Sequence, residues 1–135
     1  MPTATELPIA TLSGGTIDAT DLANEIFGDG VTIVSATYAG DLRSAGIYTD
    51  GDAVSPEATP GDTGVIQSTG LSRDFNNSEG ALITNQRTST STDTAGVNND
   101  TDFNALAGRP TRDAAILETE FVPDGDWFTV DFVIS

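Results

Sequence analysis

Acidic side chains gather in the loops of this chain, and calcium binding is the chemistry that such loops can support. Two Asp-Gly-Asp triplets occupy positions 50–52 and 124–126, and a third acidic loop runs from 93 to 102. Ca²⁺ takes about six to eight oxygen ligands from carboxylates, amides and carbonyls. The third loop offers the most of these oxygens. The calcium ligands predicted in it are Asp93, Asn98, Asp100 and Asp102.

The spacing of these acidic residues leaves a second interpretation open. It does not match the twelve-residue loop of an EF-hand, which ends in a bidentate glutamate. Asp and Asn also form turns and cap helices through their own side chains, without any metal. Calcium coordination and turn formation therefore both remain possible for the 93–102 loop.

The residue types needed for most enzyme chemistry are missing. The chain has no histidine and no cysteine, and its five basic residues are all arginines. A nucleophile activated by histidine cannot be built, and the commonest zinc ligands are absent. Glu118 and Glu120 lie two residues apart on an expected strand, so their carboxylates share one face instead of facing each other across a sugar. The sequence predicts a protein that is not an enzyme.

Two arginines, Arg109 and Arg112, flank a Pro-Thr pair before the last expected strands. They could bind a carboxylate from outside, because guanidinium groups suit bidentate contacts. They could equally neutralise Asp113 and Glu118 in this acidic chain.

The formal net charge of the chain is −16, from 21 acidic and 5 basic residues. Such a field repels nucleic acid and anionic lipid, and it attracts cations. A solubility adaptation to a saline medium is the other explanation. No run approaches the roughly 20 apolar residues that span a bilayer, so we expect no membrane insertion. Residues 1–12 lack the features of a signal peptide, which leaves a cytoplasmic location, an export signal elsewhere or prior trimming.

One helix and several strands are expected along the first half of the chain. Asp18 or Thr20 can cap a short helix that ends at Gly28. Residues 31–38 are rich in β-branched side chains and predict a strand, for which 45–48 looks like the partner. A further strand is expected at 64–70, after a loop. Residues 1–15 are expected to be an extended lead-in to a single domain, 16–135.

The second half is expected to begin with a long polar loop and to end in a hairpin. One helical turn should form near residue 102, with Phe103 and Leu106 pointing inward. Strands at 114–122 and 127–134 flank a Pro-Asp-Gly-Asp turn, and the second alternates apolar and polar side chains. The expected fold class is mostly β: an antiparallel, jelly-roll-like sandwich with one short helix, open at its C-terminal edge.

The order of several short motifs resembles the choice-of-anchor L domain of bacterial surface proteins. The resemblance covers roughly residues 16–135. The motifs that carry it are Asn24-Glu-Ile-Phe-Gly28, Gly30-Val-Thr-Ile33, Tyr38-Ala-Gly-Asp41, Gly46-Ile-Tyr-Thr49, Gly64-Val-Ile-Gln-Ser-Thr-Gly70, Asp102-Phe-Asn-Ala-Leu-Ala-Gly108, Thr111-Arg-Asp-Ala-Ala-Ile-Leu-Glu118 and Phe121-Val-Pro123.

This resemblance implies a β-rich domain at the bacterial cell surface or outside the cell, with no catalytic residues to carry over. Family members continue past the last aromatic strand into further strands, so an unpaired edge is expected there. The sequence predicts a structural or adhesion module, stabilised by Ca²⁺ if the acidic loops bind it, with protein chains or glycans as partners. The alternative is an assembly subunit of a filament or particle, completed by strand addition from a neighbouring chain.

Overall fold

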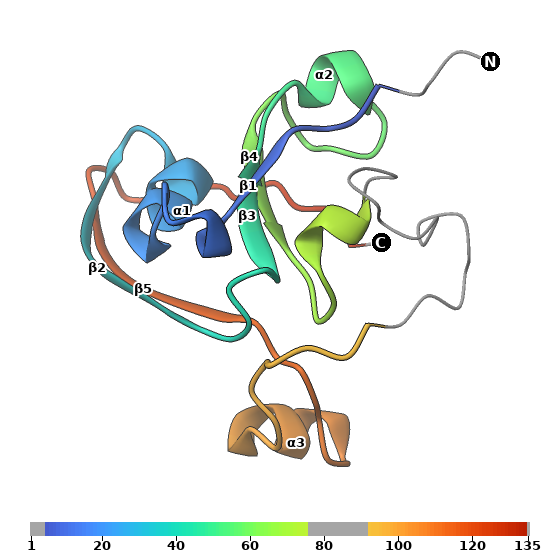
Figure 1. Ribbon diagram of the computed structural model, residues 1–135. Helices are drawn as coiled ribbons and strands as arrows, with labels where there is room; N and C mark the ends of the chain where they lie inside the picture. The colour runs from blue at the N-terminus through green and yellow to red at the C-terminus, as the bar shows by residue number, and fades with distance from the viewer. Residues whose placement is uncertain (1–4, 76–91, 135) are drawn as a thin grey trace.

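A computed structural model describes residues 5–75 and 92–134, and in them the chain forms two antiparallel sheets with a few short helices (Figure 1). The first sheet has the strand order β1-β3-β4, and the second pairs β2 with β5. The mostly-β class expected from the sequence is confirmed. The strands are β1 (Ile9–Thr11), β2 (Val31–Ala39), β3 (Ala45–Tyr48), β4 (Gly64–Gln67) and β5 (Ile116–Pro123). The helical elements are η1 (Leu12–Gly14), α1 (Ala19–Phe27), α2 (Gly51–Val54), η2 (Ser72–Phe75) and α3 (Thr101–Ala107).

The predicted first helix is α1, and its ends follow from local chemistry. The side chain of Asp18 accepts hydrogen bonds from two backbone N–H groups of the first turn, at 2.8 and 3.1 Å. Asp21 returns the contact by accepting from the Asp18 N–H at 2.9 Å, which completes a capping box. Gly28 ends the helix with a φ of 59°, although its ψ of −149° is not left-handed helical as expected. The helix docks through Leu22, which is fully buried.

The strand predicted at 31–38 is β2, but its partner is β5 and not the 45–48 strand. β2 and β5 run antiparallel from the pair Val31–Pro123 to the pair Ala39–Ile116 and form a long curved ribbon (Figure 1). The register shifts once, between Ile33 and Ser35. The β-branched residues of β2 explain why it is a strand. Its nine residues pair with the eight-residue β5, whereas the expected partner at 45–48 is only four residues long.

The 45–48 segment is a strand, β3, and it lies in the centre of the other sheet between β1 and β4. The expectation that it forms a hairpin with β2 is wrong. A turn at Asp41–Ser44, closed by the Ser44 N–H donating to the Asp41 carbonyl at 2.9 Å, leads the chain out of one sheet and into the other. β3 is nearly all apolar and buried, as suits a central strand. The lead-in expected at 1–15 supplies the edge strand β1.

Both faces of the three-stranded sheet are covered, so the core consists of two clusters. Successive side chains of a strand point to opposite faces, and Ile47 and Tyr48 of β3 therefore enter different clusters. The second cluster joins α1 to residues of both sheets and is the contact that holds the two sheets together. The first cluster is Leu7, Ile9, Val54, Ile66 and Tyr48, and the second is Leu12, Ile17, Leu22, Tyr38, Ala45, Ile47, Val65 and Leu117.

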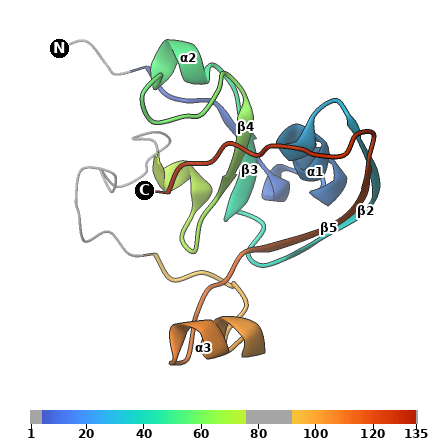
Figure 2. The same cartoon turned by 180° about the vertical axis from the view of Figure 1, so that it is seen from behind.

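The hairpin expected between 114–122 and 127–134 does not form. Its first half is β5, but after a bend at 124–126 the chain passes behind α1 and β4 as seen in Figure 1, and in front of them in Figure 2. Phe128 explains this course, because its ring packs edge-on against Phe121 of β5 and Phe27 of α1, with centroids 5.2 and 6.1 Å away. Three aromatic rings at one end of α1 thus direct the segment away from β5.

The helical turn expected near residue 102 is α3, but its apolar side chains do not point inward. Phe103 is 39% exposed and Leu106 is 89% exposed, and no residue of α3 is buried. The helix stands apart from both sheets (Figure 1). The Asp100 cap explains why a helix forms here. The apolar residues Phe103 and Leu106 did not indicate that the helix would lie away from the core.

Close packing within the first sheet makes Gly46 of β3 a specific test of the fold. A Cβ at this position would lie 2.5 Å from the carbonyl oxygen of Ala10 in β1, and backbone cannot easily yield. We expect Gly46→Ala to lower the free energy of unfolding by about 2 kcal/mol. The control Gly14→Ala points a methyl into open space and should change stability by less than about 0.5 kcal/mol. Urea denaturation measures both, and equal stabilities would contradict the close approach of β1 and β3.

Candidate functional site

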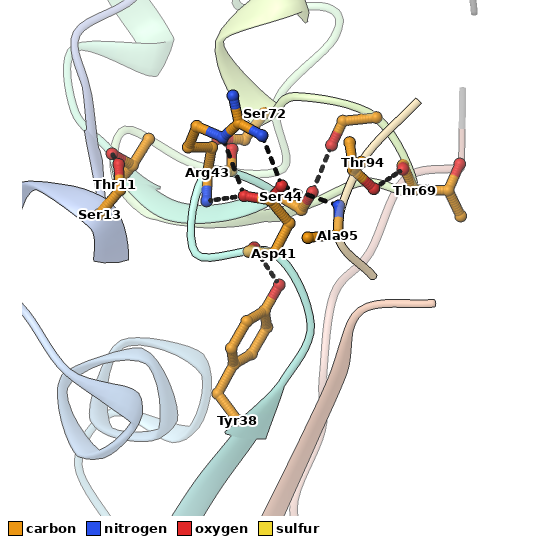
Figure 3. Close-up of polar contacts among 11 residues, drawn as sticks. Thr11, Ser13, Tyr38, Asp41, Arg43, Ser44, Thr69, Ser72, Thr94 and Ala95 are labelled. Atoms are coloured by element: carbon orange, nitrogen blue, oxygen red, sulfur yellow. Dashed lines mark hydrogen bonds and ion pairs between the residues drawn. The ribbon is translucent and has the colours of Figure 1, made fainter. Parts of the chain in front are cut away.

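A buried carboxylate, Asp41, occupies the corner where the chain passes from β2 to β3. Asp41 is 7% exposed, and its two carboxylate oxygens accept four hydrogen bonds (Figure 3). Arg43 donates from Nε to Oδ1 at 3.0 Å and from Nη2 to Oδ2 at 2.7 Å, which is a bidentate ion pair. The backbone N–H groups of Arg43 and Ala95 donate at 2.9 and 3.0 Å. This single side chain therefore links the corner to a segment more than 50 residues later.

Backbone groups around Asp41 extend the same network. The carbonyl of Asp41 accepts from the hydroxyl of Tyr38 in β2 at 2.9 Å. The Ser44 hydroxyl donates to the Gly70 carbonyl at 2.6 Å, and both the N–H and the hydroxyl of Ser72 donate to the Arg43 carbonyl at 2.9 Å. The corner, the segment after β4 and the segment at 92–95 are thus held together by polar contacts (Figure 3).

The ionisation of this network points to a structural role. The guanidinium of Arg43 and then the backbone N–H of Ala95 hold the pKa of Asp41 far below its usual range, so the carboxylate stays charged. Burial, and after it the charge of Asp41, raises the pKa of Tyr38, so that phenol stays neutral. A carboxylate already engaged by four donors is a poor general base and a poor metal ligand. Asp41 is a clamp between segments and not a reactive group.

Two of the four predicted calcium ligands accept hydrogen bonds from backbone N–H groups in the structure. Asp100 is the N-cap of α3 and accepts from the N–H groups of Asp102 and Phe103, both at 3.0 Å. The side-chain oxygen of Asn98 accepts from the Asp113 N–H at 3.0 Å. Within the described residues, no three acidic, histidine or cysteine side chains converge to hold an ion. Asp93 and Asp102 are exposed, and calcium binding stays a prediction.

The other charged candidates remain on the surface. Glu118 and Glu120 are exposed at alternate positions of β5, on one face as expected. Arg109 and Arg112 are exposed as well, and neither forms an ion pair with Asp113 or Glu118. Between residues that the structure describes, the ion pair that forms is the one between Arg43 and Asp41.

An open groove lies beside β4, and sequence reasoning did not anticipate it. Its volume is about 1230 Å³. One side is formed by β4 and the residues after it, including Ile66, Gln67 and Thr69. The other side is formed by the C-terminal segment, residues 127–134, through Val130 and Phe132 among others. In Figure 2 this segment crosses in front of β4. We call this feature the β4 groove.

Two signals in the sequence relate to features that were missed. Asp41 and Arg43 are two residues apart between two expected strands, a spacing that permits an ion pair, but nothing local shows that Asp41 also binds the Ala95 N–H. The alternating apolar pattern of residues 127–134 indicated an extended segment. It also predicted one buried face, whereas side chains on both faces are exposed.

No protein-family model, curated protein or solved structure matches the chain. In the described part of the chain, no helix is long and apolar enough to cross a membrane.

The clamp at Asp41 makes stability depend on pH in a defined way. Asp41→Asn should lower the free energy of unfolding by about 3 kcal/mol near neutral pH, because the ion pair and one or more hydrogen bonds are lost. The folded pKa of Asp41 lies below the value of about 3.9 in the unfolded chain. The stabilisation is therefore fully present above pH 4 and decreases as pH falls toward the folded pKa. Urea denaturation from pH 2 to pH 7 should show the gap between variant and wild type narrowing below about pH 4.

The exposed Asp126 provides a matched control for the Asp41 experiment. Asp126→Asn removes the same charge from a bend on the surface and should stay within about 0.5 kcal/mol of the wild type. A gap for Asp41→Asn that is as large at pH 2 as at pH 7 would contradict the assigned role of its carboxylate.

The two interpretations of the acidic loop are separated at Asp100. As an N-cap, Asp100→Ala should speed hydrogen exchange of the Asp102 and Phe103 amides about fivefold, while Asp100→Asn should preserve protection, because asparagine caps equally well. As a calcium site, the loop should show NMR shifts on addition of Ca²⁺ at fixed ionic strength, and Asp100→Asn should weaken them. If only the alanine variant loses protection and Ca²⁺ causes no NMR shifts, Asp100 is a helix cap and not a calcium ligand.

Proposed function

We propose that this chain is a non-catalytic structural module of a secreted or cell-surface protein, and that it acts by joining to other protein chains through its C-terminal segment. The observation that carries the proposal is the exposure of that segment. Trp127, Val133, Phe132 and Ile134 are all more than half exposed, the last two to 75% and 87%. A soluble chain rarely exposes so many large apolar side chains in one run unless something covers them.

The backbone of this segment supports the same proposal. Residues 127–134 are extended but belong to no strand, and no hydrogen bond links their backbone to another described residue. Extended chain with free N–H and C=O groups is a template for pairing with a further strand. Apolar side chains and backbone groups with no partner among the described residues therefore occur on the same eight residues.

The acidity of the chain means that contact between copies must come from its apolar side chains. The chain carries a net charge of −16, and residues 127–134 hold one acidic residue, Asp131, among eight, which is about the average charge density of the chain. Two copies therefore repel each other, and the exposed apolar side chains of this segment must outweigh that repulsion. The absence of histidine, cysteine and lysine from the sequence supports the non-catalytic part of the proposal.

The finer architecture belongs to this proposal as well. The core cluster that joins β2, β3, β4, β5 and α1 lies between the two sheets, which is how a sandwich begins. We take the sheets to be the two halves of an antiparallel, jelly-roll-like sandwich that a further strand would extend. The location outside the cell and the use of Ca²⁺ or glycans rest on the resemblance and on the acidic loops.

Analytical ultracentrifugation at micromolar concentrations tests the proposal. The wild type should self-associate, and added salt should strengthen association because it screens the repulsion between acidic surfaces. Phe132→Asp and Ile134→Asp should each reduce association at least tenfold while leaving the melting temperature unchanged, since both side chains are exposed.

Leu106→Asp in α3 is the matched control for Ile134→Asp. Both positions are aliphatic, their exposures are 89% and 87%, and the charge change is the same. The control should associate like the wild type. A wild type that stays monomeric at high salt, or a control that dissociates as readily as the segment variants, would overturn the proposal.

A further inference from the structure

We infer that the partner of the C-terminal segment is β4 of a second copy of this chain, so that two copies exchange segments and each three-stranded sheet gains a fourth strand. This inference rests on the proposed function and adds to it the identity of the partner and the place of contact. The juxtaposition that carries it is the β4 groove, which has on one side the edge of β4 that bonds to no described strand and on the other side the segment.

β4 is the edge best suited to accept a strand. Its pairing with β3 covers Gly64–Gln67, and the Ser68 N–H continues the ladder by donating to the Ser44 carbonyl at 2.9 Å. Its other side bonds to no strand among the described residues. Residues 64–71 carry no charge, so an incoming segment meets no acidic side chain on this strand.

The other three strand edges are each protected. β1 is only three residues long. β2 carries an irregularity between Ile33 and Ser35, and β5 presents the exposed carboxylates of Glu118 and Glu120. Short strands, bulges and charged side chains are the devices that keep sheet edges from pairing. β4 is itself only four residues long, but its pairing with β3 has no irregularity and it carries no charged side chain.

The segment of the same chain passes the groove without bonding to β4. Phe128 packs against Phe27 and Phe121 and fixes where the segment begins, which leaves residues 129–134 as the free part. These six residues are close in number to the five-residue ladder of β4 and Ser68. The volume of the groove, about 1230 Å³, leaves room beside β4 for an extended chain from outside.

A two-fold arrangement satisfies both copies at once. If the segment of one copy adds to β4 of the other, symmetry places the second segment on the first copy's β4, and both free edges disappear together. The strand brings no charge to this contact and the segment brings one, Asp131, although Glu25, Asp74 and Asp113 also line the groove. A single closed contact of this kind gives a dimer and not a filament.

The absence of cysteine in the sequence makes disulfide mapping in trans a clean test. One chain carries Gln67→Cys on β4, and a second chain, lengthened by a tag, carries Thr129→Cys, Asp131→Cys or Val133→Cys in the segment. Disulfides need Cα atoms roughly 4.4–6.8 Å apart, so they report adjacent strands. After mixing and mild oxidation, we expect a hetero-disulfide with at least one segment position, seen on a non-reducing gel. The control pair Gln67→Cys with Leu106→Cys should give at least tenfold less.

Each result separates the inference from the proposed function. Self-association through the segment without a Gln67→Cys hetero-disulfide overturns the inference and leaves the proposed function standing. A chain carrying both cysteines that forms the disulfide only within itself shows the segment closing on its own β4, and this also overturns the inference. A monomeric wild type overturns both.

Discussion

The ion pair between Asp41 and Arg43 sits at the point on which the arrangement of this fold depends. The chain leaves β2 at Gly40 and enters the other sheet at Ala45, and Asp41 fixes the corner between them by accepting four hydrogen bonds. A buried carboxylate is costly unless it is paired and fully hydrogen-bonded, and here both conditions are met. Because one donor is the Ala95 N–H, the same side chain also holds the segment that leads to α3. The Asp41 carboxylate thus lies between the two sheets and binds the later half of the chain through the Ala95 N–H.

The strong acidity of the chain acts as a second constraint, on association rather than on folding. With a net charge of −16, contact between copies is unfavourable over most of the surface. Residues 64–71, which include β4, carry no charge, and the structure places them across one groove from the exposed apolar segment. In the proposed contact between copies, acidity disfavours other surfaces and the apolar side chains supply the attraction.

The sequence predicted elements well where the signal was local, and it failed where partners were chosen. The capping box of Asp18 and Asp21 and the stop at Gly28 define α1 from neighbouring residues alone. β3 and the 127–134 segment also have readable extended patterns, but each was assigned the wrong partner. In both cases the assignment followed chain order, since consecutive strands often pair, while a corner at Asp41 and an aromatic contact at Phe128 directed the chain elsewhere. The candidate calcium loop shows the same limit, because Asp100 is equally suited to a cap or a ligand until its neighbours are placed.

The sequence by itself determined the mostly-β class, the first helix, the acidic character and the lack of histidine and cysteine chemistry, because these depend on residue type and on neighbours within a few positions. Three features follow from the tertiary structure instead: Asp41 is buried, β2 pairs with β5, and residues 127–134 pass beside β4 without a strand partner among the described residues. Each of these depends on contacts between residues far apart in the chain. Such contacts are selected by the packing of the whole core, for which no single segment carries the information.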